Sequence, residues 1–259
     1  MRVALSMALV AQGAGAAVFA RRSSGVSLRK RLNVNNLVAA PGTLELDLAG
    51  LHSFSTGSFL LPTAVRFTPD GDSFWLGRTE YSVAFDAVNS TVAEGGRASR
   101  FSDRVSIAAT SVVLSRPHLV MAISPQVTAL LRGDSGVRAG ATAIARFDRA
   151  GHAIGLAAGW SGATAPADGT NPAGLWDCGA GYGRVLGLSG WRSRLTPHVN
   201  LLGEKSTDAA WAGAVTGGVE YQINERASFD VSVQRFGLPG GGADWQLLVG
   251  TTINLGKLQ

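Results

Sequence analysis

Hydrophobic and polar residues alternate with a period of two along much of the chain, most clearly between Phe74 and Val88. The odd-numbered positions there are mostly apolar or aromatic, whereas the even-numbered positions include Arg78, Glu80 and Asp86. Successive side chains of a strand point to opposite faces of a sheet, so this pattern gives one apolar and one polar face. A run of about fifteen such residues is longer than the roughly five or six residues of an ordinary globular strand. The pattern therefore predicts an unusually long strand.

The same alternation returns in many other segments, and it is clear near the C-terminus. Phe229, Val231 and Val233 alternate with polar residues, and the run that begins at Trp245 does the same. Collecting these segments predicts twelve strands, an even number as in single-chain bacterial outer-membrane barrels. The predicted strands lie near residues 43–52, 60–68, 73–88, 101–114, 118–131, 137–147, 152–160, 175–186, 193–203, 209–223, 228–236 and 244–255.

The predicted connections alternate in length. Short turns are expected at 69–72, 115–117, 148–151 and 224–227, with a somewhat longer one at 187–192. Most of the others are longer, notably residues 89–100, 161–174 and 237–243. Short periplasmic turns and long extracellular loops are typical of transmembrane barrels, and this arrangement puts both chain ends in the periplasm.

These patterns predict an all-β fold, a transmembrane antiparallel up-and-down β-barrel of about 12 strands. A soluble β-sandwich with one solvated face would also alternate, but it would not need such long strands or alternating loop lengths. Trp75, Trp176 and Trp245 fall at predicted strand ends, where the aromatic girdles of membrane barrels lie. After the N-terminal region, the sequence holds no run of 18 uninterrupted apolar residues, so helical spans are not expected.

The N-terminus is typical of an export signal. Met1 and Arg2 precede an uncharged run from Val3 to Ala20, which ends in small residues suited to signal peptidase. We therefore expect a signal peptide over 1–20, a basic and flexible segment over 21–40, and the barrel over 41–259. Positive charge directly after a cleavage site hinders export, so the true start codon and the cleavage site stay open.

The net charge of +5 comes from this N-terminal region. Its basic residues are Arg2, Arg21, Arg22, Arg29, Lys30 and Arg31, and removing these six from 23 leaves 17 basic against 18 acidic residues, a net charge of −1. The rest of the chain has no basic stripe for phosphates, which argues against a nucleic-acid partner. Charged residues make up 16% of the chain, below the roughly 25% of soluble domains.

The polar face of the predicted strands supplies the candidate functional residues. In a small barrel such residues either pair with one another and fill the interior, or they line a path and tune its preference for ions and solutes. The turn at 224–227 is expected to place Glu220 opposite Asp230, with Arg194 nearby to balance the two carboxylates. The lumen-lining candidates are Arg78, Glu80, Arg104, Arg146, Arg194, His198, Glu220 and Asp230.

Enzymatic and cofactor chemistry are not expected. Twelve-stranded barrels include a phospholipase, but no serine motif accompanies His198, and a nucleophilic serine needs a histidine to activate it. The glycines between Gly179 and Gly183 lie within an alternating strand and have no following helix to bind a pyrophosphate. Cys178 is the only cysteine, so no disulfide can form within the chain. No metal site of histidines and carboxylates is apparent, and no cofactor is predicted.

Several segments resemble the meta-pathway phenol-degradation transporter family, a family of outer-membrane barrels of this size. The resemblance lies in the stretch from Pro41 to Leu46, in Leu61-Pro62 before the strand with Arg78-Thr79-Glu80, and in residues 221–226 before Ser228-Phe229-Asp230. It extends loosely from about residue 41 to 255 and implies passage of small, hydrophobic or aromatic compounds. One departure is the C-terminus, where Ile253 and Leu255 stand in place of the usual aromatic residue of the barrel-assembly signal.

We therefore expect an outer-membrane channel or porin-like transporter for small compounds in a Gram-negative-type bacterium. A non-transporting envelope barrel with a structural or adhesive role is the main alternative, and a lipid-modifying enzyme is a further one. The expected partners are outer-membrane lipid, the barrel-assembly machinery and a small-molecule solute. In the strand near 175–186, Cys178 should face lipid and Gly179 the lumen. The substrate, the openness of the lumen and the oligomeric state stay open.

Overall fold

The computed structural model describes most of the chain from the start of the barrel onward. No helix among the described residues is long and apolar enough to cross a membrane. The described residues are 38, 40–70, 78–93, 96–101, 104–131, 136–164, 173–186, 195–207, 210–224, 226–238 and 244–257.

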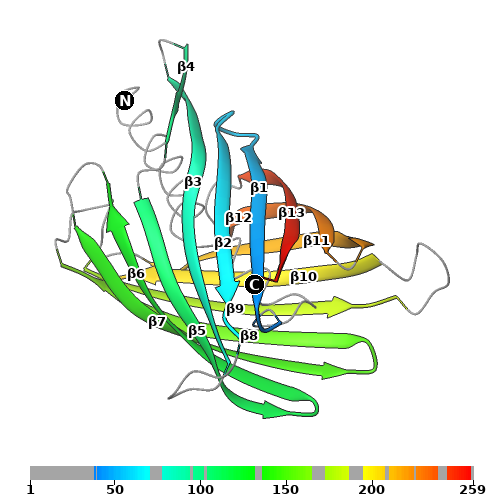
Figure 1. The fold of residues 1–259 in the computed structure, drawn as a ribbon. Helices are drawn as coiled ribbons and strands as arrows, with labels where there is room; N and C mark the ends of the chain where they lie inside the picture. Colours follow the sequence, from blue (N-terminus) through cyan, green and yellow to red (C-terminus); the bar gives the residue numbers. More distant parts are fainter. Residues whose placement is uncertain are drawn as a thin grey trace.

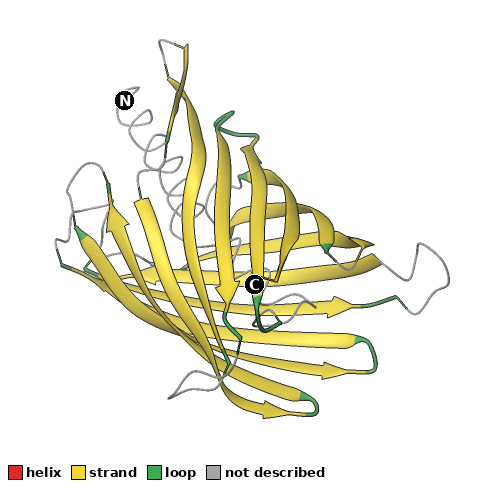
Figure 2. Cartoon of the chain, in the orientation of Figure 1, coloured by secondary structure: helices red, strands yellow, loops and turns green. Residues whose placement is uncertain are grey.

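Twelve of the described strands form a closed antiparallel barrel, in which each strand pairs with its neighbours along the chain (Figures 1 and 2). The ring closes where the first strand pairs with the last, from Thr43↔Lys257 to Ser53↔Gln246. The barrel strands are β1 (Thr43–Ser53), β2 (Phe59–Thr68), β3 (Thr79–Ala93), β5 (Arg104–Arg116), β6 (Leu119–Leu130), β7 (Val137–Arg149), β8 (His152–Ala163), β9 (Gly174–Arg184), β10 (Leu195–Ser206), β11 (Ala212–Asn224), β12 (Ala227–Leu238) and β13 (Trp245–Lys257).

The predicted fold and the number of barrel strands are confirmed, with one addition. The segment 89–100 was predicted as a long loop, and this prediction is wrong. Its first part continues β3, and its second part forms β4 (Gly96–Arg100). The two strands pair from Asn89↔Arg100 to Ala93↔Gly96 and project beyond the barrel wall (Figure 1). Asn89 and Ser90 at its base are buried, whereas Val92 farther out is 55% exposed, so an apolar residue of this hairpin is exposed and does not mark an outer face against lipid. The predicted start of β3, residues 73–77, lies outside the described residues.

The two ends of the barrel differ in their connections. At the end that holds the first residue of β1 and the last of β13, here called the terminal end, three pairs of strands are separated by only two residues. In one of these turns Ala150 and Gly151 have φ values of 51° and 80°, as a type I′ hairpin turn requires. Connections at the other end, the loop end, span five or more residues. The predicted alternation holds for these turns, whereas residues 71–77 of the connection between β2 and β3, and residues 187–194 of that between β9 and β10, lie outside the described residues.

The outer and inner faces of the wall have opposite character. Along β8, Ile154, Leu156 and Trp160 point outward and are about half exposed, whereas Ala153 and Ala157 alternate with them and are buried. The inner positions of the other strands carry many serine, threonine, asparagine and charged side chains, and most of these are buried. An apolar outside around a polar inside is the reverse of a water-soluble protein and is the pattern of a barrel in lipid.

Aromatic side chains gather near both ends of the outer face. At the loop end, Trp160 and Trp176 pair with ring centroids 6.4 Å apart, and Arg235 lies 5.7 Å from the ring centroid of Trp245. At the terminal end, Tyr182 is exposed, and its hydroxyl lies 2.7 Å from His152 Nδ1. Such girdles mark the two interfaces of a bilayer. Of the three predicted girdle tryptophans, Trp75 lies outside the described residues.

Adjacent glycines of β11 give a test of the wall's packing. A Cβ added to Gly218 would lie 2.3 Å from Ser232 Cβ and 2.6 Å from the Val231 carbonyl oxygen, whereas nothing lies within 4 Å of one added to Gly217. We expect Gly218→Ala to lower the free energy of unfolding by roughly 1–3 kcal/mol through overpacking. Gly217→Ala should leave it unchanged or raise it slightly. Urea unfolding in phospholipid vesicles measures both, and equal effects would contradict the inward placement of Gly218.

Candidate functional site in the barrel lumen

The inner face at the terminal end is built around one buried arginine. Arg66 of β2 reaches two strands at once: its guanidinium lies 2.8 Å from Glu45 and 2.7 Å from Asp47 on β1, and 3.5 Å from Glu80 on β3. Asp47 and Glu80 are fully buried. The hydroxyl of Thr252 on β13 donates to Asp47 at 2.6 Å. These contacts link four neighbouring strands across the point where the ring closes.

Sequence reasoning named Glu80 but missed Glu45, Asp47 and Arg66. Their inward orientation could have been predicted from the alternation along the first two strands, because Glu45 and Asp47 alternate with Leu44, Leu46 and Leu48. All three residues occupy the alternate positions that carry polar side chains, so they lie on the inner face together with Glu80.

A second cluster lies on the neighbouring part of the same end. Glu220 and Asp230 are Cα partners in the β11–β12 ladder, as predicted. Both are buried, and His198 Nε2 of β10 lies 3.4 Å from Asp230 Oδ2. Arg194, expected to balance these two carboxylates, lies outside the described residues. His198 was predicted as a lumenal residue, but sequence reasoning did not place it beside Asp230.

The remaining candidates are spread over the wall. Arg146 of β7 lies 2.8 Å from Asp148, whose side chain is 42% exposed. Arg78, just before β3, donates from Nη2 to the carbonyl oxygen of Val38 at 3.3 Å. Arg104 begins β5 and is a Cα partner of Leu130. The structure thus gathers Glu80 into the Arg66 cluster and joins His198, Glu220 and Asp230, but it keeps the other arginines apart.

The His198 cluster does not have the order of a catalytic triad. Ser232 Oγ donates to Asp230 Oδ1 at 3.0 Å, so the serine is bonded to the acid, whereas a triad places the histidine between serine and acid. Gly218 is the Cα partner of both His198 and Ser232, and Ser232 packs so closely against it that a Cβ at this position would lie 2.3 Å from Ser232 Cβ. Within the described part of the chain, no group of three or more histidine, cysteine, aspartate or glutamate residues could hold a metal ion.

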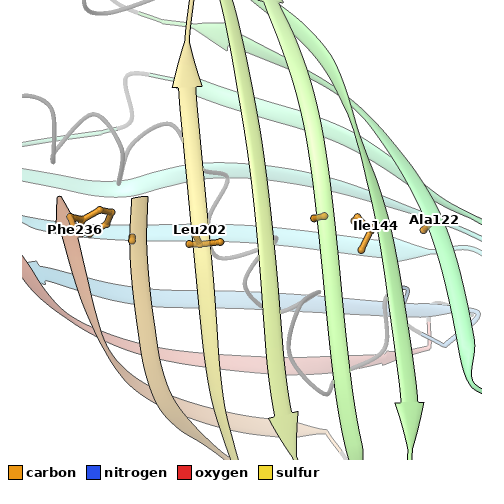
Figure 3. Packing of buried hydrophobic residues seen from close by; sticks show 6 residues of the cluster. Ala122, Ile144, Leu202 and Phe236 are labelled. Carbon is orange, nitrogen blue, oxygen red and sulfur yellow. The ribbon is translucent and has the colours of Figure 1, made fainter. Parts of the chain in front are cut away.

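One line of inner positions is apolar across seven strands. In the ladders each member is the Cα partner of the next, and Gly179 of β9 completes the line. Figure 3 shows the row crossing successive strands. It begins near the terminal end on β6 and reaches the loop end on β12, because a line perpendicular to tilted strands climbs along the barrel. We call it the apolar row; its side chains, all buried, are Ala122, Ile144, Ala157, Leu202, Ala214 and Phe236.

Polar residues lie on both sides of the apolar row. The adjacent line on one side includes Thr142 and Asp177, and that on the other includes Asn200 and Thr216. Asn200 and Thr216 are fully buried. The lumen wall therefore presents a continuous apolar strip bordered by hydroxyl, amide and carboxylate groups.

Comparisons with known proteins identify the fold but no family. No protein-family model matches this chain, and no curated protein matches it. The proposed membership of the phenol-degradation transporter family therefore stays a prediction.

Solved structures with the same fold include barrels of different kinds. The NanC porin aligns with a TM-score of 0.57 at 8% identity, over 81% of this chain and 100% of that one. The β domain of the Bordetella autotransporter BrkA aligns with a TM-score of 0.52 at 11% identity, over 83% and 99%. The CymD monoaromatic hydrocarbon channel aligns with a TM-score of 0.51 at 8% identity, over 84% and 89%. At these identities the likeness shows a shared outer-membrane barrel fold.

The Arg66 cluster gives a second test. Arg66→Gln would leave three carboxylates together in a buried site, so we expect it to lower the free energy of unfolding by roughly 3–5 kcal/mol. Arg116→Gln, at an exposed position at the terminal end of β5, is the control and should change it by no more than about 0.5 kcal/mol. Urea titration in vesicles, followed by tryptophan fluorescence, measures both. A small loss at Arg66 would show that the cluster does not hold the closing strands together.

Proposed function

We propose that this chain is an outer-membrane channel that passes small compounds, as porins do. The observation that carries the proposal is the inverted distribution of side chains, with exposed apolar residues outside and polar or charged residues inside a closed ring. Its strands are long enough to cross the hydrocarbon core, which takes about 9–11 residues of tilted strand. Twelve strands enclose more space than the eight of barrels filled by side chains alone.

The apolar row supports hydrophobic or aromatic compounds as the solutes. A small apolar molecule could remain in contact with Ala122, Ile144, Leu202 and Phe236 in turn while polar groups border its path. The sequence resemblance to phenol-degradation transporters implies the same class, and CymD, which shares the fold, is a channel for monoaromatic hydrocarbons. In this proposal, the turns at the terminal end and both ends of the chain face the periplasm, and the loop end faces the cell exterior.

One observation favours the alternative of a non-transporting envelope barrel. Every side chain of the apolar row is at most 9% exposed, so these side chains do not line a wide open pore. A permanently closed barrel would serve a structural role, whereas a channel needs a path along these side chains. No observation supports catalysis, and no enzymatic activity is proposed.

Leu202 and Leu201 of β10 test the channel, because the first is inward and buried and the second is outward and 56% exposed. Purified protein should give discrete conductance steps in planar bilayers. Cells that carry the chain in the outer membrane should take up a monoaromatic compound faster than cells without it.

Leu202→Ser should lower that uptake about fourfold or more, since each lost methylene contact is worth about 0.8 kcal/mol. Leu201→Ser should leave uptake unchanged once protein levels are matched by heat-modifiable migration in gels. The absence of conductance steps, or recovery of the chain as a soluble periplasmic protein, would rule the channel out.

A further inference from the structure

Three basic side chains lie in one row on the outer face of the wall, at the terminal end of β7, β8 and β9. These strands are neighbours in the sheet (Figure 1). Arg149, the last residue of β7, is the Cα partner of His152, the first of β8, and His152 is the Cα partner of Arg184, the last of β9. All three occupy the outward positions of their strands, and both arginines are exposed. We call these three residues the basic row.

The two arginines of the basic row flank one position without a carboxylate between them. Among the ion pairs of the described residues, none includes Arg149 or Arg184. The adjacent Asp148 lies at an inward position and pairs with Arg146 at 2.8 Å. Neighbouring strands are about 4.8 Å apart, so the Cα atoms of the two arginines are roughly 10 Å apart. Like charges on one face of a sheet repel each other, and an anion held between them would offset that repulsion.

The histidine between the two arginines is held by a tyrosine. The hydroxyl of Tyr182 on β9 lies 2.7 Å from His152 Nδ1, and the ring centroids are 5.9 Å apart. When the hydroxyl donates to Nδ1, the neutral imidazole carries its hydrogen on Nε2 and can donate it to an acceptor. The basic row then offers two guanidinium groups and one imidazole N–H to the same anion. Phosphate suits such a site, because a guanidinium binds it through two parallel N–H groups.

The outer face next to the basic row is apolar. One step toward the loop end, Phe147, Ile154 and Tyr182 are Cα partners across the same three strands, and each is between 39% and 47% exposed. The outward positions beyond them carry no charged residue as far as Trp160 and Trp176. A ligand of the basic row therefore meets cations at one end and an exposed apolar wall at the other. That combination fits a molecule with a phosphate headgroup and hydrocarbon chains.

We propose that the basic row is a binding site for an anionic phospholipid. Arg149 and Arg184 hold the phosphate, His152 donates to it, and the acyl chains lie along the outer face of β7, β8 and β9. Basic side chains at a membrane interface attract anionic lipid headgroups. The proposed orientation of the terminal end makes this a lipid of the periplasmic leaflet. The inference rests on that orientation and on a barrel in lipid, but it does not depend on transport.

Native mass spectrometry of the full chain in detergent tests the headgroup preference. Wild-type protein should bind phosphatidylglycerol at least tenfold more tightly than phosphatidylcholine with the same acyl chains. Arg149→Gln combined with Arg184→Gln should abolish that preference. The matched control is Arg226→Gln combined with Arg235→Gln, which removes the same charge from exposed positions outside the basic row. The control should retain the preference, and heat-modifiable migration in gels verifies that both variants are folded.

Photolabelling of the wild type locates the lipid without any variant. Phosphatidylglycerol with a diazirine on its acyl chain, in phosphatidylcholine vesicles, should label peptides that contain Phe147, Ile154 or Tyr182. Excess unlabelled phosphatidylglycerol should prevent this labelling, and the same concentration of inorganic phosphate should not.

Three results would overturn the proposal. Labelling spread evenly around the barrel, or an equal loss of preference in the control, would show that the lipid is not held at the basic row. Displacement by inorganic phosphate would assign the row to a soluble anion. Unchanged lipid binding with loss of folded protein from cells would assign it to a protein partner in assembly. Neither measurement uses conductance, so the failure of the channel and the failure of this site remain distinguishable.

Discussion

The structure depends on the pairing of its first and last strands. In the hydrocarbon core of a membrane, each backbone N–H and C=O must bond within the protein, so an open sheet edge is not tolerated. β1 and β13 remove both edges by pairing along their whole length, with one irregularity between Leu44 and Glu45. The Arg66 cluster lies at this seam and adds side-chain bonds across it, from β3 through β2 and β1 to β13. Backbone closure and buried charge thus reinforce each other at the terminal end.

Much of the fold could be predicted from the sequence, because its main constraint is local. Whether a side chain lies on the outer or the inner face of the barrel depends only on its odd or even position along the strand. Trp176 and Cys178 are therefore outward and Glu220 and Asp230 inward, as predicted. The hairpin of β3 and β4 could not be found in this way. It projects beyond the barrel wall, where Val92 is exposed, and its sequence carries no alternation of apolar and polar residues.

The partners within the lumen were harder to predict, since they depend on how neighbouring strands are staggered. Glu220 lies opposite Asp230, as predicted, although the ladder carries an irregularity between Gln222 and Asn224 that the prediction did not include. His198 reaches Asp230 across β11, and that contact requires two ladder registers at once. The apolar row has the same origin, because its members come from six strands and align only when six successive registers are known. The alternation in the sequence therefore identified which residues lie on the inner face, but not which of them are neighbours on adjacent strands.

Cys178 tests the central claim, that the outer face of this barrel lies in lipid. It is exposed on the outer face of β9 beside Trp211, whereas the next residue, Gly179, belongs to the inner line. In protein reconstituted into vesicles, an apolar maleimide dissolved in the bilayer should modify Cys178, and a charged maleimide should react at least tenfold more slowly than with the unfolded chain. With Cys178→Ala and Gly179→Cys combined, the preference for the apolar reagent should disappear. If the charged reagent modifies Cys178 in vesicles as fast as in the unfolded chain, the outer face does not lie in lipid and the account is wrong.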